Sequence, residues 1–163
     1  MAEMDRATTA PKRAADERPA GGKAGEAGFT AAEKAAVRER AAELKAARRG
    51  KGAGSGLEEM MAKVAKLPEA DRVLAEGIHQ VVMRAAPQLE PTTWYGMPAW
   101  AKDGRSLCFF QPASKFRARY AMFGFNDAAR LDDGRMWPVY FAVTELAPEV
   151  EERIAALVRK AAG

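Results

Sequence analysis

The sequence predicts an α+β fold in which helices pack on one face of an antiparallel sheet. Two observations lead to this prediction. Apolar residues recur at helical spacing up to residue 86 and again after Pro148. Between these limits they alternate with polar residues or gather in short runs bounded by turn residues, as strands do. Helical and strand-like segments are thus segregated along the chain.

Four segments of the chain differ in composition. Residues 1–28 hold Ala, Gly, Pro and charge with almost nothing large to bury, so we expect a disordered basic tail. Residues 29–49 predict a lone helix, and "GKGAGSG" at 50–56 predicts a flexible linker. The compact α+β domain is expected at 57–163.

The lone helix is predicted from its first turn and its composition. Thr30 followed by Glu33 is a capping box, and strong helix formers make up most of the body. Val37 and Leu44 give the helix a thin apolar stripe. A stripe this thin leaves open whether residues 30–48 dock on the domain or stand away from it.

Three further helices are expected within the domain. The first two span about 57–66 and 69–86, and the third begins near Pro148, which suits a first helical position. The second has one apolar face at helical spacing, formed by Leu74, Ile78, Val81, Val82 and Ala85.

The strands lie between these helices. "KDG" is expected to join strands at 98–101 and 105–111 in a hairpin. The run "KFRARYAM" at 115–122 alternates as a half-buried strand does. "RMWPVYFAV" predicts a final strand that starts at Pro138 or lies at an edge, because proline cannot donate to a ladder.

Composition excludes several chemistries. Cys108 is the only cysteine and His79 the only histidine, which excludes an intrachain disulfide and a zinc site built from nitrogen and sulfur ligands. Cys108 lies in the apolar run "SLCFFQ" and is expected to be a buried, unreactive thiol. No nucleophile elbow or phosphate-binding loop is present, so we expect neither an enzyme nor a cofactor.

The start of the chain predicts no secretory signal, and no apolar run is long enough for a membrane span, so a cytoplasmic protein is expected. The net charge of +4 lies wholly in residues 1–52, which hold 12 Lys and Arg against 8 Asp and Glu. Residues 53–163 hold 14 of each. Nucleic-acid binding would therefore depend on the basic leader, and a solvated tail is the favoured interpretation.

The stretch "TWYGMPAW" at 93–100 is the main candidate for a binding site. Gly96 permits a sharp turn and Pro98 favours an extended Met97, so the stretch is a bend that leads into a strand. Its large side chains either close the core or line a pocket. The cations of the 115–122 strand could orient an anionic group beside them. The candidate ligand face is Trp94, Tyr95, Met97, Trp100, Lys115, Arg117 and Arg119.

Carboxylates are the remaining option for a metal. Asp127, Asp132 and Asp133 gather in the loop "NDAARLDDG" and could offer oxygen ligands to a hard cation or to iron. Asp-Asp-Gly is also ordinary turn chemistry, which is the favoured interpretation.

Taken together, these blocks resemble the YdhG-like family of small bacterial domains, some of which are described as frataxin-like intracellular iron chaperones. The resemblance covers about residues 57–161 and is carried by "WYGMPAW", "DGRSLCFF", "SKFRARYAMFGF", "LDDGRMWP" and "VEERIAALVRKAA". It implies a compact α+β domain with helices against an antiparallel sheet, and it implies no reaction. The iron-chaperone role implies surface carboxylates, but this domain is neutral overall, so no metal ligand is carried over.

The function expected from the sequence is that of a non-enzymatic cytosolic binding module for a small anionic ligand or a protein partner. Two alternatives stay open. One is a frataxin-like iron chaperone that uses surface carboxylates, and the other is a nucleic-acid adaptor that uses the basic N-terminal segment.

Overall fold

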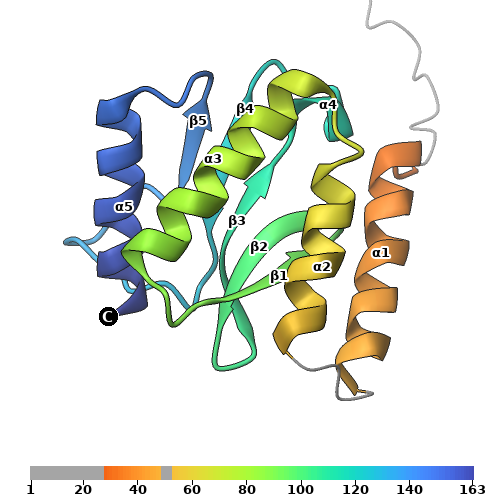
Figure 1. Cartoon of the computed structure of the whole chain (residues 1–163), viewed down its shortest axis with the longest axis horizontal. Coiled ribbons are helices and arrows are strands. Elements are labelled where there is room, and N and C mark those ends of the chain that lie inside the picture. The colour runs from red at the N-terminus through yellow and green to blue at the C-terminus, as the bar shows by residue number, and fades with distance from the viewer. Residues whose placement is uncertain (1–27, 49–52) are drawn as a thin grey trace, which may run out of the picture.

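The computed structural model describes residues 28–48 and 53–163 (Figure 1). In chain order the elements are α1 (Ala31–Arg48), α2 (Ala53–Val64), α3 (Glu69–Ala85), β1 (Glu90–Trp94), β2 (Met97–Lys102), β3 (Arg105–Gln111), α4 (Ala113–Phe116), β4 (Ala121–Phe125), β5 (Tyr140–Val143) and α5 (Pro148–Ala162). Within the described ranges, the strands form one five-stranded sheet in the order β1-β2-β3-β4-β5, with every neighbouring pair antiparallel. The predicted α+β class is confirmed.

The main core lies between the sheet and three helices. Figure 1 shows α2, α3 and α5 together on one face of the sheet. Large side chains with almost no solvent exposure fill the space between the layers, among them Met60, Ile78, Val82, Trp100, Phe110, Phe123 and Val158. This burial of apolar surface is the dominant favourable term in folding.

The opposite face of the sheet is also apolar, and we call it the outer face. Antiparallel pairing places one residue from each strand in a row across it: Thr92, Ala99, Phe109, Gly124 and Tyr140. Met97, Ala99 and Phe109 form a second buried cluster on this face, packed by Trp94, Tyr95 and Phe116. A sheet with two apolar faces needs cover on both sides.

Two tight turns shape this part of the sheet. The hairpin predicted around "KDG" is confirmed, and Asp103 and Gly104 turn at φ values of 51° and 73°. A second hairpin, β1-β2, turns at Tyr95 and Gly96 with φ values of 52° and 73°. Two successive left-handed residues are the mark of a type I′ turn, which matches the twist of the flanking strands. The predicted sharp bend at Gly96 is therefore a hairpin turn.

The strand predicted at 115–122 is wrong for residues 115–120. Ala113–Phe116 forms the short helix α4, Arg117 ends it in the left-handed conformation with φ of 51°, and β4 begins only at Ala121. The cause is a tertiary contact, because the nearly buried carboxylate of Asp71 on α3 accepts hydrogen bonds from the N–H groups of Ala113 and Ser114 at 3.1 and 2.9 Å. That contact caps α4 and outweighs the alternating pattern.

The linker predicted at 50–56 is wrong for its second half, since α2 already begins at Ala53. Gly56 lies where α2 crosses β1, and a Cβ atom there would collide with the carbonyl oxygen of Pro91. The glycines of this stretch thus include one that permits close packing of a helix on an edge strand. Residues 1–27 and 49–52 lie outside the described residues, and with them most of the tail predicted at 1–28 and the first part of the predicted linker.

The helix and strand that close the chain agree with the predictions. β5 lies at the edge of the sheet and begins two residues after Pro138, and α5 has Pro148 in its first turn. His79 on α3 reaches into the core, where its Nδ1 accepts a hydrogen bond of 3.2 Å from the indole N–H of Trp100. This bond requires a neutral imidazole, and burial lowers the pKa of His79 below its ordinary value.

The first prediction concerns Gly56. Gly56→Ala should lower the free energy of unfolding by about 1–3 kcal/mol, because the added methyl group forces α2 away from β1. In an unconstrained helix the same change would raise stability by up to about 1 kcal/mol. Urea unfolding of Gly56→Ala, with Ala62→Gly on the exposed side of α2 as the propensity control, measures both effects. A stabilised Gly56→Ala variant would show that the contact with Pro91 is not tight.

The second prediction concerns pH. Because the pKa of His79 is lower in the folded state, folding favours the neutral ring. The contribution of His79 to the free energy of unfolding is therefore complete above the unfolded-state pKa of about 6.5. Stability should then fall as the pH drops through about 6.5 towards the lower folded pKa. Chemical unfolding at pH 7.5 and 5.5 tests this, since His79 is the only histidine. An equal loss in His79→Ala would assign the effect to other groups.

Candidate functional site

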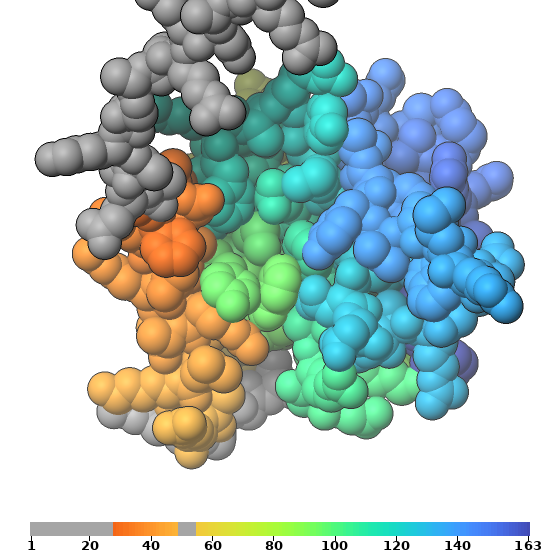
Figure 2. Space-filling view, turned by 180° about the vertical axis from the view of Figure 1, so that it is seen from behind, coloured from red at the N-terminus to blue at the C-terminus, as the bar shows by residue number. Residues whose placement is uncertain are grey.

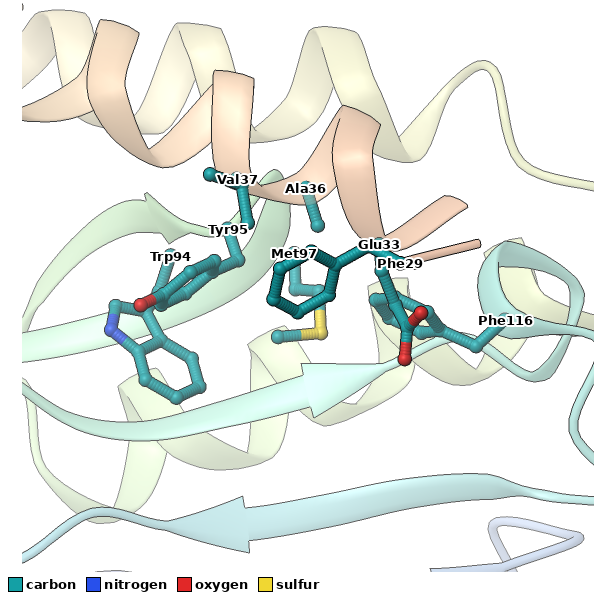
Figure 3. Close-up of a pocket in the computed structure, with 8 residues that line it drawn as sticks. All are labelled: Phe29, Glu33, Ala36, Val37, Trp94, Tyr95, Met97 and Phe116. Carbon is teal, nitrogen blue, oxygen red and sulfur yellow. The ribbon is translucent and has the colours of Figure 1, made fainter. Parts of the chain in front are cut away.

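The outer face of the sheet meets α1 in an apolar pocket, which we call the outer pocket (Figure 3). The sheet side contributes Trp94 from the end of β1, Tyr95 from the turn, Met97 from the start of β2 and Phe116 from α4. The α1 side contributes Phe29, Glu33, Ala36 and Val37. The pocket has a volume of about 280 Å³ and opens to solvent. Its apolar walls suit a hydrophobic side chain or a small apolar group.

Aromatic rings extend from this pocket across the outer face. Trp94 stands edge-on to Tyr95 at 4.8 Å and lies 4.7 Å from Phe109, which in turn lies 5.8 Å from the ring of Tyr140. Gly124 leaves room for this arrangement, because a Cβ atom there would collide with the rings on both sides. Seen from behind, the strand segments reach the surface beside α1 (Figure 2). Tyr140 is 56% exposed, so the apolar surface continues beyond the pocket.

α1 is held on the Tyr95–Gly96 turn by a carboxylate. The two oxygens of Glu43 accept hydrogen bonds from the N–H groups of Tyr95 and Gly96 at 3.0 and 2.8 Å. The Glu43 side chain is only 8% exposed, and its partners are two successive amides that point the same way. Such amide pairs bind anions, and hydrogen bonds to a charged acceptor are the stronger class.

A second carboxylate lies one helical turn earlier. The carboxylate oxygens of Glu39 form ion pairs with the Nζ atoms of Lys63 on α2, at 3.0 Å, and of Lys115 on α4, at 2.6 Å. Burial by itself raises the pKa of Glu39, but the hydrogen bonds from Lys115 and Lys63 outweigh it and hold the pKa below its ordinary value. A Cβ atom at Gly96 would collide with the Glu39 carboxyl, so only glycine permits this approach.

The structure brings together part of the candidate ligand face. Trp94, Tyr95 and Met97 meet in the outer pocket, and Lys115 lies next to it, paired with Glu39. Trp100 does not belong to the site, because strand alternation turns its side chain into the main core beside His79.

Arg117 and Arg119 do not line the pocket either. Both are exposed, and the sheet face predicted to align them with Lys115 does not exist because α4 replaces that part of the strand. Sequence reasoning also missed Glu39 and Glu43, whose partners lie 24 to 76 residues away along the chain.

The groups considered for metal or nucleophilic chemistry lie elsewhere. Asp127 pairs with Arg105 at 3.1 Å, and Asp132 and Asp133 are exposed in the β4–β5 loop. Among residues 28–48 and 53–163, no three His, Cys, Asp or Glu side chains are grouped so that they could hold a metal ion. Cys108 is fully buried, and burial raises the pKa of its thiol far above the ordinary value.

No protein-family model, curated protein or solved structure matches this chain. The resemblance to YdhG-like domains therefore stays a hypothesis based on the motifs quoted above. None of the described helices combines the length and the hydropathy that a bilayer crossing requires.

The third prediction tests the carboxylate that holds α1. Glu43→Gln keeps the size of the side chain but removes the charge and one of the two acceptor oxygens. Loss of a charge-assisted pair should raise hydrogen exchange at the Tyr95 and Gly96 amides by about tenfold or more. Exchange in β3 should stay unchanged, and Glu76→Gln on the exposed side of α3 is the matched control. Unchanged protection at both amides would mean that α1 docks without Glu43.

Proposed function

We propose that this chain is a binding module without a catalytic role, and that it takes apolar side chains of a protein partner in the outer pocket. The observation that carries the proposal is the pocket itself. Aromatic and aliphatic side chains from β1, β2, α4 and α1 converge there on a space that they leave unfilled. Partly exposed aromatic residues around a hollow are typical of interaction sites.

The chemistry of the pocket walls favours a protein partner over a small anion. No Lys or Arg is among the described residues that line the pocket, and the one carboxylate among them is that of Glu33. The Glu33 carboxylate is hydrogen-bonded to the N–H of Thr30 at 2.7 Å in the capping box. These walls offer no cation to an anionic ligand, whereas a Leu or Phe side chain could occupy the pocket and pack against them.

The absence of a catalytic role is part of the proposal. Cys108 and His79 are the side chains best suited to nucleophilic or acid–base chemistry, but Cys108 is buried in the core and the half-buried His79 accepts a hydrogen bond from Trp100. A thiolate at Cys108 would be strongly disfavoured by burial. The two-layer α+β fold is also what the YdhG-like resemblance implies, which supports membership of that family as a further proposal.

The fourth prediction tests the site with a peptide library. Selection of displayed peptides on the full chain should enrich sequences that share one or two large apolar residues. The enriched peptide should bind Trp94→Ala at least about tenfold more weakly, since buried aromatic residues dominate such interfaces. Met136→Ala is the control, because Met136 is 90% exposed and lies outside the pocket. Isothermal titration measures the affinities, and circular dichroism confirms that the variants are folded.

Two results would contradict the proposal. One is a selection that yields no shared apolar positions. The other is a selected peptide that binds wild-type chain and Trp94→Ala equally well while both remain folded.

A further inference from the structure

We propose that α1 is an intramolecular ligand, and that the surface beneath it is a receptor for an acidic helix of a partner protein. The partner helix would carry two carboxylates one turn apart and would replace α1. This inference rests on the proposed binding function and adds the class of the partner. The sheet-side half of the outer pocket, formed by Trp94, Tyr95, Met97 and Phe116, belongs to both proposals.

The first argument is the way in which α1 is held. Ala36 is the only buried apolar residue of this 18-residue helix. The larger apolar residues at its start and on its stripe, Phe29, Val37 and Leu44, remain 67%, 51% and 48% exposed. The contacts that fix its position are polar: Glu39 with two lysines, and Glu43 with two backbone amides. A helix attached in this way can leave without opening the main core.

The second argument is that the receptor side is built without α1. The Tyr95 and Gly96 amides are presented by a hairpin turn whose φ values follow from the β1-β2 pairing. Lys63 stands on α2, which packs on the sheet. Lys115 stands on α4, which Asp71 of α3 caps. Two amides and two cations at fixed positions are therefore available to any carboxylate pair of the same spacing.

The third argument is that α1 has the features of an independent helix. It is rich in Ala, Glu, Lys and Arg, and it begins with a formed capping box between Thr30 and Glu33. Arg40 also pairs with Glu43 three residues later at 3.3 Å. Ala-rich sequences of this length are near the limit at which isolated helices form in water. A free α1, or a partner segment like it, can therefore be partly helical before it binds.

These features define the partner. Glu39 and Glu43 have i, i+4 spacing, and Ala36, the buried residue of α1, precedes Glu39 by one turn. A partner helix with Glu-x-x-x-Glu and a small residue one turn earlier can repeat every polar contact. Because α1 competes from within the same chain, the apparent affinity for such a helix is reduced by the fraction of molecules in which the surface is free.

The experiment uses a labelled peptide with the sequence of residues 29–48 and the full-length chain. Glu39→Gln/Glu43→Gln weakens the internal helix and should therefore bind the peptide at least about tenfold more tightly than wild-type chain does. Fluorescence anisotropy measures the binding. Glu76→Gln, with its charge removed from an exposed site on α3, should behave as wild type. A peptide that itself carries Gln at both positions should lose binding to the double variant, and so should the unmodified peptide at high salt.

Equal binding of the peptide to wild-type chain and the double variant would overturn the inference, and so would equal binding of the Glu and Gln peptides. Should the double variant fail to fold, Glu43→Gln alone replaces it, with circular dichroism as the check. The two proposals fail separately. If library peptides bind in a Trp94-dependent way but the α1 peptide does not bind, the proposed binding function stands and only this inference fails. If neither kind of peptide binds, both proposals fail.

Discussion

The bond between the Glu43 carboxylate and the Tyr95–Gly96 turn is the contact on which the arrangement of the site depends. A type I′ turn directs two successive N–H groups away from the sheet, and neither can pair within the hairpin. Buried amides need an acceptor, and Glu43 supplies both oxygens at 3.0 and 2.8 Å. Because Glu43 is fixed there, α1 runs along the edge of the sheet, Ala36 meets the outer face, and the outer pocket acquires its second wall.

The pocket is a consequence of incomplete cover. Among the elements of residues 28–48 and 53–163, α2, α3 and α5 cover one face of the sheet, whereas α1 lies along one side of the outer face (Figures 1 and 2). Gly124 leaves room for the Phe109 ring beside that of Tyr140, and the centre of this face is buried largely by its own aromatic rings. Among the described residues, the junction where Trp94 and Tyr95 lie opposite the first turns of α1 stays open as the outer pocket (Figure 3). Larger side chains on this face of α1, such as leucines in place of alanines, would fill the outer pocket.

Patterns that depend on neighbours in sequence predicted much of this fold, and contacts between distant residues defined the rest. The helical stripe around Ile78 and Val82 and the hairpin at Gly104 follow from local spacing, and both are present. The alternation in "KFRARYAM" failed because Asp71, more than 40 residues away, caps α4 instead. Trp94 and Tyr95 could be selected as candidates from composition alone. Glu43 could not, because its partners are backbone amides whose direction is set by turn geometry and which no residue type reveals.

The charged contacts of α1 also determine which groups become exposed on the sheet side when α1 is displaced. Lys63 and Lys115 lie within 3.0 and 2.6 Å of oxygens of the same carboxylate, so they are close to each other and tolerate this only because Glu39 stands between them. Without α1, two like charges remain close to each other beside two amides that have lost their carboxylate acceptor, and water solvates all four groups. Two carboxylates on one helix at the spacing of Glu39 and Glu43 would restore these ion pairs and hydrogen bonds together, which separate water molecules or salt ions do not. The interactions that hold α1 in place are thus the same ones that give the vacated surface its preference for an acidic helix.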